Sequence, residues 1–275
     1  MAFRQTISVL SEKSKSKSAS WASRQFRDPY VKKRLSDPAA YRARSAFKLL
    51  EVDETWTFLD HPDVNAVVDL GAAPGGWSQV VASKLGWTPS PSTTSEPVRA
   101  RPKPERLAHF DPLNIDDVGG HATEVKGRGK IISVDLLDIA PIPGVHTIKA
   151  DFMDGATTRQ IKQLLIGPGN PFGKADVILS DMAANITGHE YVDIQSSCDI
   201  CEAVFEFTRN NLRTADSIGR KQGGVLLIKY FDHPLLQGFL DQYLKPNFQY
   251  THRIKPKSSR ATSRENYFLC RGWNP

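Results

Sequence analysis

Long hydrophobic runs are absent from this 275-residue sequence. No apolar stretch approaches the roughly 20 residues that a membrane-spanning helix requires, so we predict no membrane span. Cysteine is scarce, with only three residues. Three thiols cannot build a full disulfide framework, which favours a reducing compartment. With 40% hydrophobic and 24% charged residues, the composition is that of a globular protein.

A second cysteine pair is also lacking. Cys198 and Cys201 form a C-x-x-C motif, but a structural zinc site normally requires four ligands. The strand–helix context of a redox motif is missing as well. We therefore predict that both cysteines are partly buried packing residues and that the protein has no metal site.

The phosphate-binding fingerprint G-x-G-x-x-G does not occur, which argues against a nicotinamide dehydrogenase. In its place, "DLGAAPGGW" (residues 69–77) forms a glycine-rich turn after a short apolar segment. Glycines in such a turn allow a ligand to approach the backbone closely. The turn therefore predicts a ligand that is not a dinucleotide.

Acidic residues are rare at both ends of the chain. Residues 1–34 have a net charge of +7 and residues 245–275 a net charge of +6, so the remainder is close to −7 within a total of +6. Two basic ends around an acidic body favour a polyanionic partner. Residues 1–23 are rich in serine and lysine and are predicted to be disordered or to resemble an organelle transit peptide.

Strand-like and helix-like segments alternate along the chain, which favours a mostly parallel sheet with helices on both faces. The predicted strands are 65–71, 130–135, 145–151, 175–181, 223–231, 249–256 and 266–272, and the predicted helices are 41–54, 75–86, 156–166, 194–215 and 233–244. The last two strands are expected to form an antiparallel hairpin pair. Residues 88–126, rich in proline and serine, are predicted to be a surface insertion without a chemical role within a single domain, 24–275.

Charged residues follow several of the predicted strands. Asp135, Asp151, Asp181 and Lys229 lie at or near their carboxyl ends, which is the edge where open α/β sheets bind ligands. Asp135 ends the second strand, where an acidic side chain typically binds both ribose hydroxyls of an adenosine. An acidic side chain that binds ribose, without a phosphate-binding motif beside it, predicts an adenosine cofactor that has no phosphates. S-adenosylmethionine is such a cofactor.

Five separated motifs in this order resemble the FtsJ/RrmJ family of ribose 2'-O-methyltransferases. They are "YRARSAFKLLEV", "VVDLGAAPGGWSQ", "SDMAANITG", "LLIKYF" and "SSRATSRENYFL". The resemblance covers residues 24–272 apart from the insertion. The opening segment "RDPYVKKRLSDPAAYRARSAFKLLEVDE" is most similar to the mitochondrial large-subunit rRNA branch, which implies the mitochondrial matrix as the location. The resemblance implies a Rossmann-like class I methyltransferase fold. Ala184 departs from the family pattern, which usually has proline there.

The resemblance also implies which residues form the site. A Lys-Asp-Lys-Glu catalytic tetrad falls on Lys48, Asp181, Lys229 and Glu265. Contacts with S-adenosylmethionine fall on Pro74, Gly75, Gly76, Trp77, Asp135, Asp151 and Asp181. The implied partner is large-subunit rRNA or a pre-ribosomal subunit, with a uridine near the peptidyl-transferase region as acceptor. We expect the protein to act as a monomer.

The residue chemistry agrees with this assignment. A 2'-hydroxyl must lose its proton as it attacks a sulfonium methyl group, so a general base is required. Lys229 follows the apolar run "VLLI", where a bare charge is costly without a function. Basic residues on both sides of the tetrad would contact RNA phosphates; they are Arg24, Arg27, Lys32, Lys33, Arg34, Arg42, Arg44, Lys255, Lys257, Arg260 and Arg264. Tyr30, Tyr41 and Tyr230 could stack on a splayed base or pack internally.

Two alternatives use the same residues. The same chemistry could act on a tRNA anticodon loop or on cap RNA. The protein could also be an RNA-binding ribosome-assembly factor whose catalysis is dispensable, although an intact tetrad favours an enzyme.

Overall fold

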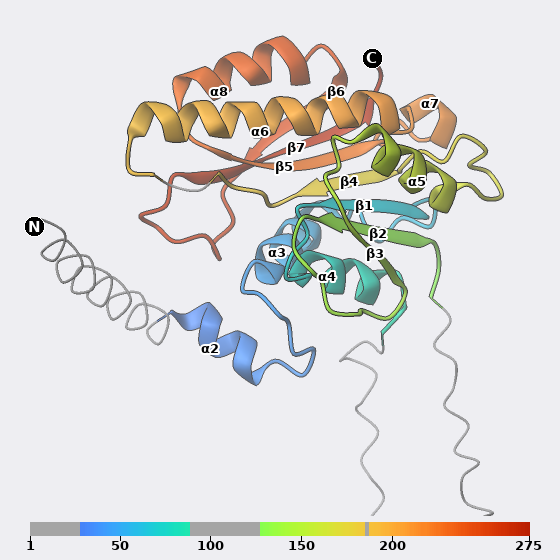
Figure 1. Ribbon diagram of the computed structural model, residues 1–275, viewed down its shortest axis with the longest axis horizontal. Coiled ribbons are helices and arrows are strands. Elements are labelled where there is room, and N and C mark those ends of the chain that lie inside the picture. Colours follow the sequence, from blue (N-terminus) through green and yellow to red (C-terminus); the bar gives the residue numbers. More distant parts are fainter. Residues whose placement is uncertain (1–27, 89–126, 185–186) are drawn as a thin grey trace, which may run out of the picture.

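The computed structural model describes residues 28–88, 127–184 and 187–275 (Figure 1). The predicted N-terminal segment 1–23 lies outside the described residues, and so does the predicted insertion apart from Thr88. None of the helices in the described ranges is long and apolar enough to cross a bilayer.

One seven-stranded sheet organises the chain, as the sequence predicts. The strands are β1 (Ala66–Leu70), β2 (Lys130–Asp135), β3 (Val145–Lys149), β4 (Val177–Ser180), β5 (Val225–Phe231), β6 (Phe248–Ile254) and β7 (Glu265–Trp273). They lie in the order β3-β2-β1-β4-β5-β7-β6. The first five strands pair in parallel, and β7 pairs antiparallel with both β5 and β6. The antiparallel C-terminal pair confirms the predicted hairpin.

Helices cover both faces of this sheet (Figure 1). The helices are α2 (Pro29–Ser36), α3 (Ala46–Trp56), α4 (Gly76–Lys84), α5 (Gly155–Leu165), α6 (Glu190–Asn211), α7 (Ala215–Ile218) and α8 (Pro234–Phe239), with a π-helical turn η3 (Leu240–Leu244) after α8. One apolar core joins α5, α6 and α8 to the sheet, and a second core joins α3 and α4 to the opposite face. Strands β1 and β4 are buried throughout because they lie between these two cores.

Two helix boundaries differ from the prediction. The helix predicted from Tyr41 begins at Ala46, because Arg42 makes long-range hydrogen bonds: its backbone N–H donates to Gln79, and its guanidinium donates to the carbonyls of Ala140 and Pro141. The helix predicted at 194–215 spans 190–211. Thr214 caps the separate helix α7 through its side chain, which ends the longer one.

The two segments that flank residues 89–126 lie against each other. The Arg128 N–H donates to the Leu85 carbonyl at 2.8 Å, and the Trp87 indole N–H donates to the Arg128 carbonyl at 3.0 Å. These contacts join the end of α4 to the start of β2. A short turn is therefore sufficient to connect them.

We expect a variant in which a short glycine-containing turn replaces residues 89–126 to fold and to bind S-adenosylmethionine like the full chain. The reason is that the flanking residues already contact each other. The entropy cost of closing a flexible loop also falls as the loop becomes shorter. Thermal melting and calorimetric titration with the cofactor would measure both properties. An unfolded variant, or one that no longer binds the cofactor, would show that the segment has a structural role.

Candidate active site

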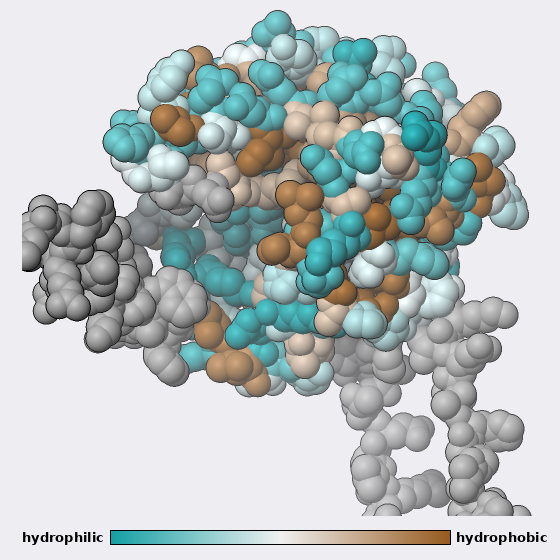
Figure 2. Space-filling model, viewed as in Figure 1, coloured by the Kyte–Doolittle hydropathy of each residue, from teal (hydrophilic) through white to brown (hydrophobic). Residues whose placement is uncertain are grey.

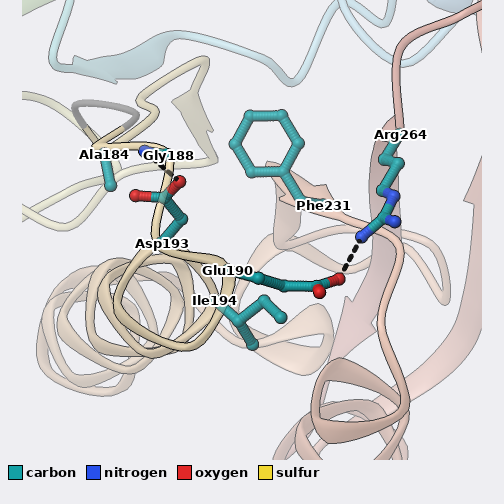
Figure 3. A pocket seen from close by; sticks show the side chains of 7 residues that line it. All are labelled: Ala184, Gly188, Glu190, Asp193, Ile194, Phe231 and Arg264. Carbon is teal, nitrogen blue, oxygen red and sulfur yellow. Dashed lines mark hydrogen bonds and ion pairs between the residues drawn. The ribbon is translucent and has the colours of Figure 1, made fainter.

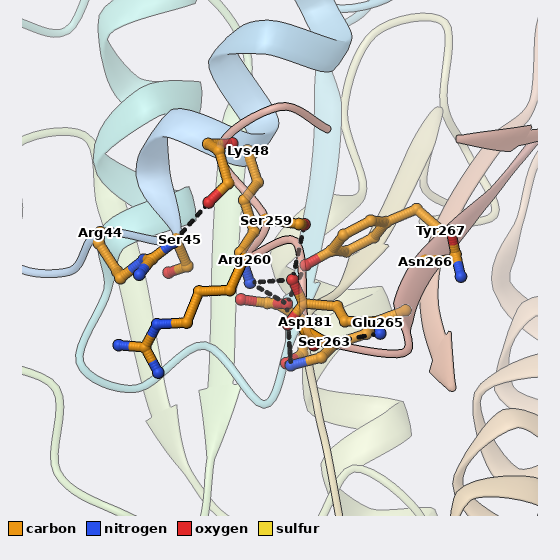
Figure 4. Close-up of polar contacts among 12 residues, drawn as sticks. Arg44, Ser45, Lys48, Asp181, Ser259, Arg260, Ser263, Glu265, Asn266 and Tyr267 are labelled. Carbon is orange, nitrogen blue, oxygen red and sulfur yellow. Dashed lines mark hydrogen bonds and ion pairs between the residues drawn. The ribbon is translucent and has the colours of Figure 1, made fainter. Parts of the chain in front are cut away.

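The four predicted tetrad residues meet at the carboxyl edge of the sheet. Lys48 reaches this edge from α3, Asp181 follows β4 and Glu265 begins β7 (Figure 4). Lys229 lies in β5. Pairing of β5 with β7 places Lys229 opposite Tyr267 and Phe231 opposite Glu265. Facing residues of an antiparallel pair point to the same side of a sheet. The side chains of these two facing pairs, Lys229 with Tyr267 and Phe231 with Glu265, therefore lie on one face.

Charges of opposite sign alternate around this cluster. The Lys48 ammonium lies 2.7 Å from a Glu265 oxygen and 4.0 Å from Asp181. The Lys229 ammonium lies 3.3 Å from Glu265 and 3.4 Å from Asp181. Each carboxylate thus contacts both amines, so the two positive and two negative charges balance. The contact of Glu265 with Lys229 is longer than its contact with Lys48, so Glu265 holds Lys229 less tightly than it holds Lys48.

The Glu265 carboxyl is the strongest electrostatic anchor of the cluster. Burial by itself would raise its pKa, but the positive charges of Lys48 and Lys229 outweigh burial and lower the pKa to about 2. The Ser259 hydroxyl adds a hydrogen bond to the same carboxylate at 2.8 Å. Glu265 is therefore ionised at neutral pH and fixes both amines in place.

Sequence reasoning missed Tyr267. Its hydroxyl donates to an Asp181 oxygen at 2.6 Å, and its ring is fully buried. Burial, followed by the charges of Asp181 and Glu265, raises the pKa of Tyr267 well above its usual value, so the hydroxyl remains a donor. The signal in the sequence is the spacing, because Tyr267 lies two residues after Glu265 in a strand and faces the same side.

The glycine-rich turn after β1 has a conformation that requires glycine at two positions. Gly71 has φ +67° and Gly75 has φ +103°, a backbone region that side chains rarely adopt. A Cβ at Gly71 would overlap the Met182 side chain, and a Cβ at Gly75 would lie 2.8 Å from Ile142. The Asp135 carboxylate accepts hydrogen bonds from the N–H groups of Ala73 and Leu137, each at 2.8 Å. Asp135 therefore fixes the turn while remaining half-exposed.

The other predicted cofactor residues lie around the same turn. Pro74 is exposed and follows a cis peptide bond, and Gly76 begins α4. The Trp77 side chain is buried and donates to the Ser45 carbonyl at 2.9 Å, so only its backbone would be available to a cofactor. Asp151 is exposed just beyond β3 and accepts from the Met153 N–H.

A further carboxyl, Asp69, lies below the turn. The Ser78 hydroxyl donates to it at 2.6 Å and also contacts the Ser133 hydroxyl at 2.7 Å. Burial raises the pKa of Asp69 to about 7, with Asp181 and Asp135 adding to the effect and the Ser78 hydrogen bond opposing it. These hydroxyls connect β1 with α4 and β2, which holds the turn at the sheet edge.

Several of the predicted phosphate ligands are engaged within the protein. Arg42 donates to the carbonyls of Ala140 and Pro141 and thereby supports the glycine-rich turn. Arg44 pairs with Asp28, which also contacts Arg260 at 3.3 Å. The ammonium groups of Lys32, Lys33 and Lys257 pair with no carboxylate within the described residues and remain the better candidates for phosphate contacts. Arg24 and Arg27 lie outside the described residues.

The remaining predicted phosphate ligands also make internal contacts. The Arg34 guanidinium donates to the Arg42 carbonyl at 2.9 Å. Lys255 donates to the Ser263 carbonyl at 2.8 Å, and Arg264 pairs with Glu190 at 3.0 Å. Lys255 and Arg264 are nevertheless exposed, so RNA could still reach their charges.

Two of the three tyrosines predicted as base-stacking candidates pack internally. Tyr230 is buried and stacks on Phe268, with ring centroids 3.7 Å apart, and Tyr41 is buried against Phe47. Tyr30 is half-buried against the same phenylalanine. Cys198 and Cys201 are buried free thiols on α6, which confirms their predicted packing role.

This strand order, with a glycine-rich turn after β1 and carboxylates at the ends of β2 and β4, defines a Rossmann-like methyltransferase fold. The chain belongs to the FtsJ-like methyltransferase family, whose family model matches residues 41–273.

Individual proteins support this membership. The chain is 34% identical over 253 residues to "Ribosomal RNA large subunit methyltransferase E" of Rhodopseudomonas palustris (strain HaA2), covering 92% of this chain and 84% of that protein. It is 35% identical over 261 residues to the protein of the same name from Bradyrhizobium diazoefficiens, covering 95% and 90%. A crystal structure described as a ribosomal RNA methyltransferase of Plasmodium falciparum shares the fold, with a TM-score of 0.57 and 24% identity over 85% of this chain and 98% of that one.

Proposed function

We propose that the protein methylates a ribose 2'-hydroxyl of large-subunit rRNA with S-adenosylmethionine as the methyl donor. The observation that carries this proposal is the closed cluster of Lys48, Asp181, Lys229 and Glu265 beside the glycine-rich turn. The names of the relatives, which are rRNA large-subunit methyltransferases, favour this RNA over tRNA or cap RNA.

The residues around the turn fit an adenosine cofactor. The turn has a backbone conformation that glycine allows at Gly71 and Gly75, and Asp135 and Asp151 place carboxylates at the ends of neighbouring strands. Asp135 would bind the ribose hydroxyls, and the backbone at residues 74–77 would contact the remainder of the molecule. When bound, the cofactor supplies an electrophilic methyl group on a sulfonium.

Lys229 is the proposed general base. Its ammonium first releases one proton to solvent; the amine then accepts the 2'-hydroxyl proton at Nζ and is again an ammonium between two carboxylates. Asp181 and Glu265 lie 3.4 and 3.3 Å from that nitrogen and stabilise the charge that proton transfer creates. Lys48 balances the carboxylates and keeps Glu265 oriented. Tyr267 fixes Asp181 through its hydroxyl.

Finer aspects of the proposal rest on the sequence alone. We assign the acceptor to a uridine, the location to the mitochondrial matrix and the active species to a monomer. The basic segment 1–23 supports the location because it has the composition of a transit peptide. A fluorescent fusion of the full chain should co-localise with a mitochondrial marker and lose that location when residues 1–23 are deleted.

The choice of RNA is tested with radiolabelled S-adenosylmethionine. Large-subunit rRNA and total tRNA would be isolated from cells that lack the protein and incubated with the purified full chain. The proposal predicts labelling of the rRNA and none of the tRNA. Labelled tRNA with unlabelled rRNA would contradict it, and binding of rRNA without any label would favour an assembly factor.

Cofactor affinity should separate Asp135 from Lys229. We expect Asp135→Ala to weaken S-adenosylmethionine binding by about 1.5–3 kcal/mol, because charge-assisted hydrogen bonds are lost and the turn is loosened. Lys229→Ala should bind the cofactor like the wild type, because its role lies on the acceptor side. Calorimetric titration of both variants, with melting curves to confirm folding, measures the difference. Equal losses in the two variants would refute the assignment.

A further inference from the structure

A pocket of about 340 Å³ opens beside the tetrad, between the start of α6 and the end of β5 (Figure 3). We call it the Phe231 pocket. It is lined by Ala184, Gly188, Ile194 and Phe231, together with three charged residues, Glu190, Asp193 and Arg264. The surface around the start of α6 is mixed in Figure 2, where a hollow lined mainly by hydrophilic residues lies next to apolar patches. The tetrad, glycine-rich turn and cofactor carboxylates described above lie outside this pocket.

Phe231 connects the pocket to the reacting centre. It lies two residues after Lys229 in β5, so both side chains project from the same face of the sheet. The Lys229 ammonium lies 5.8 Å from the centroid of the Phe231 ring. Phe231 is only half-buried, whereas Tyr230 and Phe268 next to it are fully packed. An aromatic face is therefore available within reach of the group that the acceptor ribose must contact.

A second pocket, of about 290 Å³, shares Lys48 and Glu265 with the tetrad. Its lining is polar and basic and consists of Arg44, Lys48, Arg260, Thr262, Ser263 and Glu265. One neighbouring space of the tetrad is thus aromatic and apolar, and another offers guanidinium and hydroxyl groups. A nucleotide matches these two pockets, because its sugar carries a flat apolar base at one position and an anionic phosphate at others.

We propose that the Phe231 pocket binds the base of the nucleotide that is methylated, stacked on the Phe231 ring. This inference rests on the proposed function and adds to it a base-binding subsite. Single-stranded RNA is generally recognised by bases that are splayed out and stacked on aromatic side chains. Stacking on an aromatic ring does not depend on the identity of the base. Phe231 therefore orients the nucleotide and does not select the base. Arg264 and Glu190, which pair with each other at 3.0 Å, offer a donor and an acceptor to the edge of the base.

The test compares three substitutions of Phe231 in the full chain, with large-subunit rRNA from cells lacking the protein as the probe. Phe231→Ala and Phe231→Leu should each lower kcat/KM for the RNA by about tenfold or more, since stacking on an aromatic ring is lost. Phe231→Trp should remain within about threefold of the wild type because it preserves an aromatic face. The leucine variant separates stacking from simple apolar packing.

Phe172→Ala is the matched control. Phe172 is 77% exposed in the loop before β4, at the opposite end of that strand from Asp181, so its loss should leave methylation unchanged. S-adenosylmethionine affinity should be the same in all variants. The added indole of Phe231→Trp should also show RNA-dependent quenching relative to the wild type, a readout that does not require methyl transfer.

The possible outcomes separate the two proposals. Wild-type kcat/KM in Phe231→Leu, or no quenching in Phe231→Trp, would overturn the base subsite even if the wild type methylates the rRNA. A slower single-turnover rate with unchanged RNA affinity and an altered pH profile would assign Phe231 to the positioning of Lys229 and would also overturn it. RNA-dependent quenching without methyl transfer by the wild type would retain the subsite and refute the proposed reaction.

Discussion

Replacing Lys229 with alanine should lower the single-turnover rate of methyl transfer at least about 100-fold, the lower range for loss of a general base. Lys229 is the amine that lies in β5 beside both carboxylates, with longer contacts to Glu265 than Lys48 has. RNA binding should barely change, because one lysine among many phosphate contacts supplies little of the affinity. Lys221→Ala, at the exposed turn before β5, is the matched control and should react like the wild type.

Lys229→Arg distinguishes proton transfer from simple positive charge. A guanidinium stays protonated in proteins, so this variant should be as slow as Lys229→Ala. A base that must first lose a proton predicts a wild-type rate that rises with pH, and both variants should lack this rise. Single-turnover assays with saturating cofactor from about pH 6 to 10 measure these profiles. A nearly wild-type rate in Lys229→Arg would mean that Lys229 supplies only charge and that the proton leaves by another route.

Replacing Glu265 with glutamine should have the largest effect on stability. The Glu265 carboxylate contacts both Lys48 and Lys229, and removing its charge leaves two nearly buried ammonium groups with Asp181 as their only carboxylate partner in the described chain. Because its folded pKa of about 2 lies below the ordinary value of 4.5, we expect a loss on the order of 3 kcal/mol in the free energy of unfolding at neutral pH.

The same comparison has a defined pH dependence. A depressed folded pKa stabilises the protein above about pH 5, and that contribution is lost as the pH falls through 4.5 toward 2. The unfolding free energies of the wild type and Glu265→Gln should therefore converge in acid. Glu206→Gln is the control, because the Glu206 carboxylate makes exposed contacts, an ion pair with Arg209 and a hydrogen bond from Asn210. Parallel curves for the wild type and Glu265→Gln would show that the ion pairs add nothing to stability.

Much of this arrangement follows from local patterns in the sequence. The buried strands β1, β4 and β5 are short apolar segments that end in a charged or glycine-rich turn, so their existence and their carboxyl edge can be inferred. The tetrad residues follow from motif order. Their contacts confirm that Lys48 and Glu265, 217 positions apart, meet at 2.7 Å.

Tertiary contacts limit what the sequence can predict. Arg42 reads as a phosphate ligand but bonds to carbonyls about 100 residues away, a pairing that no local pattern encodes. Tyr230 reads as a stacking residue, but strand alternation turns it to the packed face, and Phe231, one position later, faces the site. The exact strand register decides which of two adjacent aromatic residues faces the tetrad.

The central claim is that this cluster methylates a ribose oxygen rather than a base. Large-subunit rRNA from cells lacking the protein would be methylated in vitro with the wild type and with Lys229→Ala, and then cleaved with alkali. A 2'-O-methyl group blocks attack of that oxygen on the adjacent phosphate, so the modified linkage resists cleavage. We predict one alkali-resistant, labelled dinucleotide with the wild type and none with Lys229→Ala. Label found on a nucleobase, with every linkage cleaved, would contradict the account.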